Sequence, residues 1–362
     1  MATMATIRSV TGPALATEPA VRVSVAVPCF NYGRFLRDCV GSLLTQEGIA
    51  IDITIVDDAS TDDSLAVAQA LAAGDSRVTV IESAHHRGHV ETFNTALDAA
   101  TGEYVVKMDA DDMVPPGALA RAVRLLNAHP EVSFVYGHPQ VFRETAPTEF
   151  DNRVRGWTIW NGEDWIARVV ERSHNVIMQP EVVMRRSAVI AIGGHLPENP
   201  EASDLNFWLR LASVGSVARI DGPVQGLYRV HPDSLQRTVH AGYLRDLNGR
   251  VVAFELFFRD RGHALQRGKE LEARSRLRLS RDAMQIAQRA IDKRRDAEER
   301  IAEYLDIAAR LDPTVSSSRR WRSIRRRSIG SLVTGRSRRN VGTLVRDLED
   351  KVRWRRWRRY GR

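Results

Sequence analysis

Short apolar runs alternate with helical patterns along the first 110 residues of the chain. The runs are rich in Val and Ile and predict strands, because β-branched residues pack well on a pleated sheet. Between them, apolar residues recur at three- and four-residue spacing, which predicts helices. The expected strands are 21–27, 51–56, 78–81 and 104–108, and the expected helices are 35–46, 64–73 and 90–100. This alternation predicts an α/β fold with a mostly parallel sheet and helices on both faces.

Polar segments follow three of these strands directly. They are residues 29–32, 57–62 and 109–112. The carboxyl ends of parallel strands form the ligand-binding edge of an open sheet, so we expect these segments to meet there. Asp109, Asp111 and Asp112 concentrate negative charge that a hard divalent cation bridging diphosphate oxygens would neutralise. An Asp-rich turn without a ligand is the alternative, and we expect Asp62 and Asp63 to shape the turn before the second helix.

The composition is that of an ordinary globular protein, with 43% apolar and 27% charged residues among 362. It excludes wholesale disorder, and the length suggests about two structural units. Two cysteines, Cys29 and Cys39, argue against a disulfide framework and favour a reducing compartment. No uncharged apolar run approaches the ~18 residues of a bilayer span, and residues 1–20 resemble a flexible lead-in without a secretion signal. We therefore expect a cytoplasmic protein, soluble or peripheral on the inner face of the cell membrane.

The motifs at the strand ends resemble those of glycosyltransferase family 2, whose members have the GT-A fold. The resemblance rests on Val-Ser-Val-Ala-Val-Pro-Cys-Phe-Asn-Tyr at 23–32, Ile-Thr-Ile-Val-Asp-Asp-Ala-Ser-Thr-Asp at 53–62 and Asp-Ala-Asp-Asp at 109–112. It continues through 193–194, 204–212 and 228–231. The resemblance implies a GT-A catalytic domain over 21–240 that transfers a sugar from a nucleotide-sugar donor to a hydroxyl acceptor with inversion.

The resemblance also assigns a site for the nucleotide sugar. Asp58 would accept a hydrogen bond from the nucleobase, in a pocket lined by Pro28 and Phe30. Asp109 would contact the ribose or the shell of the metal. A UDP-sugar is the expected donor, because uridine nucleotides are the commonest in the family.

A divalent metal, Mn²⁺ or Mg²⁺, is implied by the same resemblance. Asp111 would be its principal ligand, and His231 would close the metal and pyrophosphate site. The family usually has a Gly-Gly-basic run near residue 88, where this chain has His86 and His89 around Arg87 and Gly88. For this run we favour a solvated or phosphate-facing loop over a second metal cluster.

Asp204 aligns with the acidic residue that acts as general base in the family, removing the proton of the acceptor hydroxyl. Its position before the apolar run 205–214 is also that of a helix N-cap, and both interpretations stay open. The chain departs from the family at Ser203 and Asn206, where acidic residues are usual. Glu201 is the alternative base if the alignment shifts.

Large aromatic and basic side chains occur in the segment expected to contact the acceptor. Trp157, Trp160 and Trp165 could form a platform for sugar rings or lie in the core. Arg185, Arg186 and Arg210 could face phosphate or solvent. The sequence leaves these alternatives open.

The pattern of apolar and charged residues changes after residue 240. Apolar residues recur at helical spacing over 241–315, which predicts a helical appendage packed on the catalytic domain or used for oligomerisation. Residues 316–362 form a basic tail, and 319–362 hold 17 Lys and Arg against three acidic residues. Arg interleaved with Trp suits an anionic membrane surface. A disordered tail is the alternative, and no recognisable nucleic-acid module is present.

Two functional hypotheses follow. The first is a glycosyltransferase that acts on a glycan or lipid-linked hydroxyl acceptor in bacterial cell-envelope or exopolysaccharide synthesis. The second is a non-catalytic GT-A-fold scaffolding protein that binds partners through its basic tail. The joint presence of Asp58, Asp109, Asp111, Asp204 and His231 favours the enzyme.

Overall fold

The computed structural model describes residues 6–7, 21–234, 242–292, 300–334 and 352. The chain divides into two compact units. The first, called here the sheet unit, comprises Met1–Ile166 and Asn175–Ser234. The second, called the helical unit, comprises Ala167–His174 and Leu235–Arg362. A short segment from the middle of the chain therefore belongs with the C-terminal residues.

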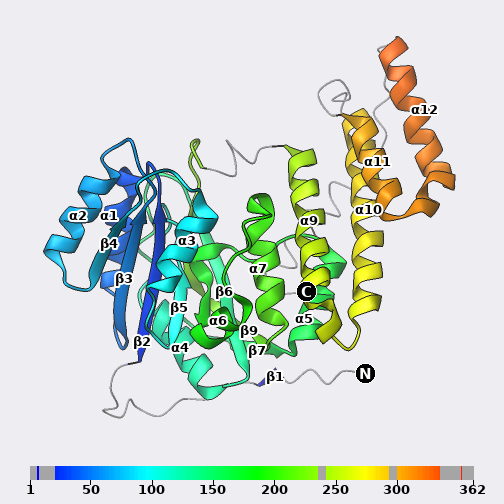
Figure 1. Cartoon of the computed structure of the whole chain (residues 1–362). Helices are drawn as coiled ribbons and strands as arrows, with labels where there is room; N and C mark the ends of the chain where they lie inside the picture. Colours follow the sequence, from blue (N-terminus) through cyan, green and yellow to red (C-terminus); the bar gives the residue numbers. More distant parts are fainter. Residues whose placement is uncertain (1–5, 8–20, 235–241, 293–299, 335–351, 353–362) are drawn as a thin grey trace. The chain divides into compact units, whose positions relative to one another are not determined.

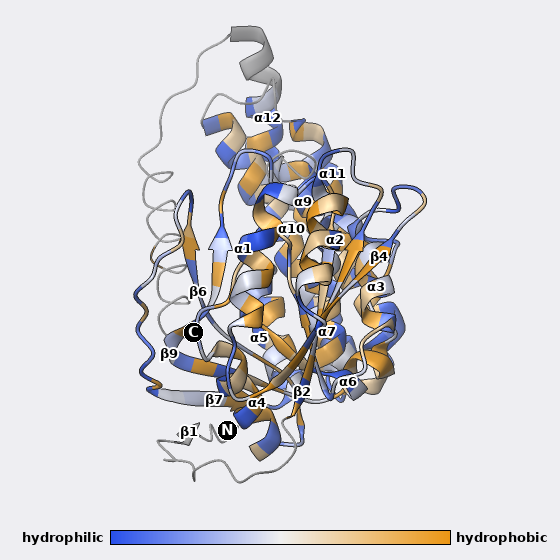
Figure 2. Ribbon diagram, turned by 90° about the vertical axis from the view of Figure 1, so that its left-hand side faces the viewer, coloured by the Kyte–Doolittle hydropathy of each residue, from blue (hydrophilic) through white to orange (hydrophobic). Residues whose placement is uncertain are grey.

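In the described residues of the sheet unit, nine strands form one sheet in the order β1-β7-β9-β6-β8-β5-β2-β3-β4 (Figure 1). The last four in this order are parallel, which confirms the expected fold class: β5 (Tyr104–Lys107), β2 (Arg22–Cys29), β3 (Ala50–Asp57) and β4 (Val78–Glu82). These strands are mostly coloured hydrophobic in Figure 2, as expected for strands buried on both faces.

The other half of the sheet is mixed and was not predicted from the sequence. Strand β8 (Val183–Arg185) runs antiparallel to both β5 and β6 (Val132–Phe142). Strand β9 (Ser216–Arg229) is parallel to β6, while β7 (Gly156–Trp160) is antiparallel to β9. The two-residue strand β1 (Thr6–Ile7) pairs with β7.

Helices pack on both faces of the sheet (Figure 1). One core cluster unites inward-facing strand residues with buried residues of α1 (Gly33–Leu44), α2 (Ser64–Gly74) and α4 (Ala118–Ala128). Side chains alternate across a strand, so Phe134, next to Val135 of that cluster, faces the opposite side and packs on Trp208. The remaining helices of this unit are α3 (His89–Asp98), α5 (Gly162–Arg172, which continues into the helical unit), α6 (Arg186–Ile192) and α7 (Ser203–Ala212).

The tryptophans of the acceptor segment are core residues rather than a platform for sugar rings. Trp165 is 2% exposed and meets Phe134 edge-on, and Trp160 is 7% exposed and stacks on Tyr136. Trp157 is half-buried and packs against the main core cluster. The physical reason is the mixed half of the sheet, which needs large side chains to fill the space between β6 and α5.

Two of the three arginines whose role the sequence left open donate to backbone carbonyl groups. The Arg185 guanidinium donates to the carbonyl oxygens of Leu126 (2.8 Å) and Val132 (3.1 Å). The Arg210 guanidinium, buried at 5% exposure, donates to the carbonyl oxygens of Gly194 (2.7 Å) and Ile192. Both side chains satisfy carbonyl groups that would otherwise be buried without donors.

The helical unit contains α9 (Tyr243–Arg261), α10 (Gly268–Asp292), α11 (Ile301–Leu311) and α12 (Arg319–Thr334). Helix α10 packs against the other three, and its apolar stripe is buried as the helical periodicity predicts. Residues 319–334, assigned to the basic tail by the sequence, form helix α12, in which Ile324 is fully buried. Arg327 of α12 donates to Asp292 at the end of α10 (2.6 Å). The tail is therefore not disordered over this stretch, while Trp354 and Trp357 lie outside the described residues.

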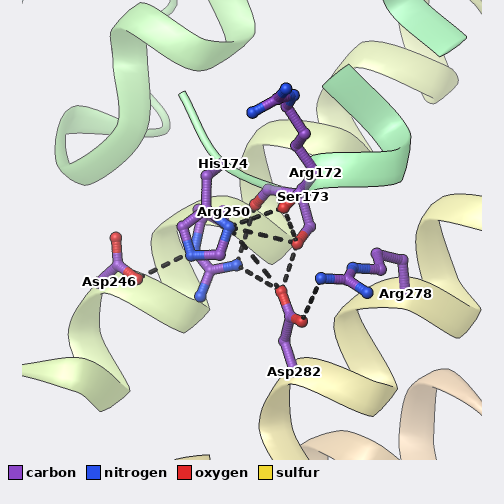
Figure 3. Close-up of polar contacts among 7 residues, drawn as sticks. All are labelled: Arg172, Ser173, His174, Asp246, Arg250, Arg278 and Asp282. Atoms are coloured by element: carbon purple, nitrogen blue, oxygen red, sulfur yellow. Dashed lines mark hydrogen bonds and ion pairs between the residues drawn. The ribbon is translucent and has the colours of Figure 1, made fainter. Parts of the chain in front are cut away.

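A buried polar cluster joins the segment Ala167–His174 to α9 and α10 within the helical unit (Figure 3). Arg250 donates to Asp282 (3.2 Å) and to the Ser173 carbonyl oxygen (2.9 Å), and its Nε donates to Asp246 (2.9 Å). The Ser173 hydroxyl donates to the same Asp282 oxygen. Ser173 is fully buried and has a φ of 55°, a left-handed conformation that only strong tertiary contacts maintain.

None of the helices in the described part of the chain combines the length and apolarity that crossing a bilayer requires.

Candidate active site

The loops that follow β2 and β3 are bonded to each other at the carboxyl edge of the sheet, as the sequence predicts. Asn31 has a φ of 57°, and its side-chain oxygen accepts the backbone N–H of Thr61 (2.7 Å). Asp62 accepts the backbone N–H of Ser64 (2.9 Å), so it shapes the start of α2 as expected. A Cβ on Gly33 would lie 2.4 Å from an Asp63 oxygen, so only glycine allows this close approach.

Asp58 lies at the end of β3 and is 1% exposed. Its two carboxylate oxygens accept the backbone N–H groups of Arg87 and Gly88, each at 2.8 Å. His86 Nδ1 lies 2.9 Å from Asp58 Oδ2, and the His86 ring packs on Phe30 with ring centroids 4.1 Å apart. Asp58 therefore fixes the 86–88 loop. His86 contacts both Asp58 and Phe30, the two residues expected to form the nucleobase pocket. Pro28, also expected here, is the penultimate residue of β2.

The Asp-rich turn after β5 meets the end of β9. Backbone hydrogen bonds in both directions join Met113 to Leu227, at 3.0 and 2.8 Å. Two residues further along, Arg229 donates from its backbone to Asp112 (2.8 Å) and from its side chain to the Asp111 carbonyl oxygen (2.8 Å). This pairing carries His231 to Asp111, with 2.9 Å between His231 Nε2 and Asp111 Oδ2. The structure thus brings together the two residues predicted as metal ligands.

The turn carries more negative charge than its neighbours neutralise. Burial, with the nearby carboxylates of Asp111 and Asp204, raises the pKa of Asp109 to about 6 despite the opposing charge of Lys107. Burial and the other carboxylates of the turn raise the pKa of Asp112, whose Oδ2 is buried without a hydrogen-bond partner among the described residues. A cation placed in this turn would relieve that repulsion.

The donor set of the turn fits a divalent ion that is shared with a ligand. Asp111 and His231 offer one oxygen and one imidazole nitrogen close together. Among the described residues, no group of three His, Cys, Asp or Glu side chains could enclose an ion. Mg²⁺ and related ions commonly take one or two carboxylates and complete their shell with phosphate oxygens and water.

Asp204 lies in the first turn of α7 and binds a lysine from the sheet. Helix α7 begins at Ser203 after the N-cap residue Ala202, and no side chain caps it. The N-cap interpretation of Asp204 is therefore wrong, because the helix starts two residues earlier than its apolar pattern suggests. The Asp204 carboxylate is 31% exposed, and its Oδ1 accepts a hydrogen bond from Lys107 Nζ (3.0 Å).

Lys107 and His195 flank Asp204 and were missed by the sequence reasoning. Lys107 is the last residue of β5 and is 4% exposed. His195 is 2% exposed, stacks on Phe207 at 4.0 Å, and has Nε2 at 4.0 Å from Asp204 Oδ1. A lysine within a run of buried strand residues was the available signal, because a buried ammonium requires an acidic partner.

Lys107 and His195 control the charge of the Asp204 carboxyl group. Burial alone would raise the pKa of Asp204, but the positive charge of Lys107, together with His195, lowers it well below its usual range. Burial lowers the pKa of His195, and Lys107 lowers it further. Burial would also lower the pKa of Lys107, but the carboxylates of Asp204, Asp109 and Asp112 together outweigh this effect and raise it. The site therefore holds an ionised Asp204 against a protonated Lys107.

The Gly-Gly motif places His195 beside this pair. Gly193 and Gly194 both have a φ of 72°, and a Cβ on Gly194 would lie 2.6 Å from the Asn94 side-chain oxygen. Asn94 of α3 accepts the backbone N–H of His195 and donates to its carbonyl oxygen, both at 2.9 Å. The turn is thereby fixed on α3.

The family model described as Glycosyl transferase family 2 matches residues 24–193, which include both strand-end loops and the Asp-rich turn and end at the first glycine of the Gly-Gly motif. Through this segment the chain belongs to glycosyl transferase family 2. Asp204 and His231 lie beyond the matched residues, Asp204 in α7 and His231 two residues after the end of β9.

Part of the chain is similar in sequence to other bacterial glycosyltransferases. Glycosyltransferase GlyG of Streptococcus pneumoniae is 38% identical over 92 residues, which are 25% of this chain and 31% of that protein. An uncharacterized glycosyltransferase of Haemophilus influenzae is 21% identical over 217 residues, or 58% of this chain and 65% of that protein. The chain thus spans less than two thirds of the length of each of these relatives.

Solved structures share the fold. The chain matches TarS 1-349 of S. aureus in complex with UDP-GlcNAc at a TM-score of 0.59 and 16% identity, covering 86% of this chain and 89% of that one. It matches the mannosyltransferase PcManGT of Pyrobaculum calidifontis, in complex with GDP-Man and Mn²⁺, at a TM-score of 0.52 and 20% identity, covering 89% of each chain. These likenesses establish the GT-A fold of the glycosyltransferase domain.

Proposed function

We propose that the protein is an inverting glycosyltransferase that transfers a sugar from a nucleotide-sugar donor to a hydroxyl acceptor. The observation that carries the proposal is the connection between the Asp-rich turn and Asp204. Lys107 Nζ lies 3.0 Å from Asp204 Oδ1 and 3.9 Å from Asp109 Oδ1. One buried cation therefore joins the expected donor side to the expected general base.

The donor would bind along the carboxyl edge of the parallel strands. Phe30 and Pro28 would line the nucleobase pocket, with Asp58 accepting from the base or holding the loop that contacts it. Asp109 would contact the ribose. Asp111 and His231 would hold Mn²⁺ or Mg²⁺, and the bound ion would stabilise the departing diphosphate as a Lewis acid.

Asp204 would act as general base. The acceptor hydroxyl oxygen attacks the anomeric carbon from the side opposite the diphosphate, and its proton moves to the Asp204 carboxylate. The new bond to the acceptor oxygen forms while the bond to the phosphate oxygen breaks, and its electron pair leaves with the nucleoside diphosphate. This single displacement inverts the anomeric configuration. The lowered pKa of Asp204 keeps its carboxylate ionised when the acceptor arrives.

The donor and acceptor classes are proposed from the relatives. A UDP-sugar is favoured because the structure of TarS 1-349 contains UDP-GlcNAc. A glycan or lipid-linked acceptor in bacterial cell-envelope or exopolysaccharide synthesis is favoured because the relatives include chondroitin synthase of Escherichia coli, which is 26% identical over 200 residues. That match covers 55% of this chain and 28% of the synthase.

Donor binding is tested by thermal unfolding with UDP-, GDP- and dTDP-sugars, each with and without Mn²⁺. We expect one nucleotide class to stabilise the wild type only with the metal, by about 2.7 kcal/mol at a hundredfold excess over Kd. That free energy corresponds to roughly 5–10 °C in Tm. The Asp111→Ala variant should lose the shift, because it loses a metal ligand. Asp98→Ala, which removes an exposed carboxylate at the end of α3, is the matched control and should keep it.

A wild type that no nucleotide sugar stabilises under either condition would contradict the enzyme and favour the non-catalytic scaffolding alternative. Stabilisation that survives in Asp111→Ala would contradict only the metal assignment.

We also propose an anionic membrane surface as a partner, through α12. Arg319, Arg322 and Arg326 are exposed on this helix, while Ile324 is buried and anchors it in the helical unit. Arg325 lies over the Trp321 ring at 5.2 Å. Each arginine near an anionic leaflet contributes about 1 kcal/mol to binding.

Vesicle flotation tests this partner. Replacing Arg319, Arg322 and Arg326 by Gln should weaken binding to phosphatidylserine-containing vesicles about 100-fold, since three charges are lost. Three exposed arginines of the sheet unit, Arg124, Arg143 and Arg153, provide the control triple variant, which should bind as the wild type does. Equal binding of the wild type to pure phosphatidylcholine vesicles would contradict the electrostatic partner.

A further inference from the structure

Lys107 occupies an unusual place for a lysine. It ends the buried strand β5 between Val106 and Met108, both fully buried, and is itself only 4% exposed. Its ammonium group lies 5.5 Å above the Phe93 ring. Transfer of an ammonium group into such surroundings is costly unless carboxylates compensate it. The carboxylates that contact it are therefore essential to its presence.

The two carboxylates within reach of Lys107 come from separate elements. Asp204 belongs to α7 and Asp109 to the turn after β5, at 3.0 and 3.9 Å from Nζ. Asp204 is 31% exposed and Asp109 37% exposed, whereas the lysine is nearly inaccessible. The ammonium group thus lies on the protein side of both carboxylates, and the carboxylates lie on the solvent side, where an acceptor arrives.

The contacts of Asp204 are also asymmetric. Lys107 Nζ and the nearest nitrogen of His195 both face Oδ1, at 3.0 and 4.0 Å. The first contact is a charged hydrogen bond, which fixes orientation more strongly than a neutral one. The Gln179 side chain also lies close enough to lower the pKa of this carboxylate. Because Lys107 holds Oδ1, the orientation of the carboxylate is restricted, and Oδ2 is the oxygen that the lysine does not hold.

We propose that Lys107 is the positioning residue of the general base. It holds Oδ1 of Asp204 so that Oδ2 meets the acceptor hydroxyl, and its contact with Asp109 keeps Asp204 aligned with the donor side of the site. The inference rests on the proposed function of Asp204. Lys107 touches neither substrate in this arrangement and acts through Asp204. A general base must be within hydrogen-bond reach of the proton that it removes, so loss of orientation lowers turnover.

A double-mutant cycle in the full-length protein tests the proposal. Lys107→Met keeps the length of the side chain and removes its charge, and we expect kcat to fall about 10–100-fold, the usual range for a residue that orients a catalytic group. The donor KM should change less than kcat, because the contact of Lys107 with the donor-side Asp109 (3.9 Å) is longer than its hydrogen bond to Asp204 (3.0 Å). Lys107→Arg, which restores a charged donor, should recover part of the lost kcat.

The cycle then compares Lys107→Met in the wild type and in Asp204→Asn. If Lys107 acts through Asp204, its removal should cost less than about twofold in kcat when Asp204 is already disabled. Lys269→Met, at an exposed position of α10, is the matched control and should leave both parameters unchanged. Should Lys107→Met fail to fold, Lys107→Gln, which is also uncharged, enters the same cycle.

Three outcomes would overturn the role of Lys107. They are wild-type kcat in Lys107→Met, equal fold losses in the two backgrounds, or a loss confined to the donor KM. In each of these the wild type still transfers sugar, so the proposed function stands. A wild type that neither binds nucleotide sugars nor transfers sugar would instead overturn both proposals together.

Discussion

Replacing Asp204 with Asn lowers kcat for sugar transfer by about 10²–10⁴-fold, the range that a general base contributes. The substitution preserves the size of the side chain and its contact with Lys107, but an amide cannot take up the acceptor proton. Donor affinity should stay within a few-fold of the wild type, because the nucleotide side of the site is formed by Asp58, Asp109 and Asp111. The measurement is steady-state transfer to a hydroxyl acceptor, with the donor-dependent Tm shift recorded in parallel.

The Asp98→Asn variant, at the exposed end of α3, is the matched control and should retain wild-type turnover. Wild-type kcat in Asp204→Asn would exclude Asp204 as the base and direct attention to Glu201, in the short 3-10 helix Pro200–Ala202. Loss of the Tm shift with unchanged kcat would indicate a donor contact instead of proton transfer.

The largest expected effect on stability lies in the helical unit. Asp282→Ala should lower the free energy of unfolding by about 3–5 kcal/mol, because it removes the buried carboxylate partner of Arg250 and leaves only Asp246, whose side chain is 53% exposed. The Ser173 hydroxyl loses one of its two oxygen acceptors in the same step and keeps the Arg172 carbonyl oxygen, and the left-handed backbone there loses support. Urea unfolding followed by circular dichroism measures the change. Asp306→Ala, at an exposed position of α11, should cost less than about 0.5 kcal/mol.

A companion variant separates charge from packing. Arg250→Leu together with Asp282→Leu removes both charges and fills the space with apolar atoms, which is often neutral or stabilising for buried ion pairs. We expect the double variant to recover most of the stability lost in Asp282→Ala. A cost below about 1 kcal/mol for Asp282→Ala would show that water, rather than the Asp282 carboxylate, compensates Arg250.

The parallel half of the sheet could be predicted closely from the sequence. The expected strands 51–56 and 78–81 are observed as Ala50–Asp57 and Val78–Glu82, because buried parallel strands are short apolar runs bounded by polar residues. The mixed half escaped prediction. Strand β8 has only three residues, and the bridge between Met113 and Leu227 joins distant parts of the chain. Neither a three-residue strand nor a single bridge produces a periodic pattern of apolar residues in the sequence.

The candidate site, too, could be predicted only in part from the sequence. Asp111 and His231 came from the resemblance, and their contact depends on Arg229, whose side chain joins the Asp-rich turn to β9. Lys107 and Asp204 are 97 residues apart in the sequence, and no local pattern connects them. His195 follows a Gly-Gly turn, but its neighbours are known only once α3 and α7 are placed beside it. Long-range pairing, which sequence periodicity does not record, decides these contacts.

The chain passes between its two units more than once, because Ala167–His174 belongs with the C-terminal helices while the residues on either side belong to the sheet. A shortened protein ending at residue 234 would keep every proposed catalytic side chain, yet it would leave Ser173 without Arg250 and Asp282. The C-terminal helices therefore cannot be exchanged between homologues as a cassette at a single junction. Domain swaps and truncations that respect this architecture need a second junction within α5, and evolution of the two units is expected to be coupled through these eight residues.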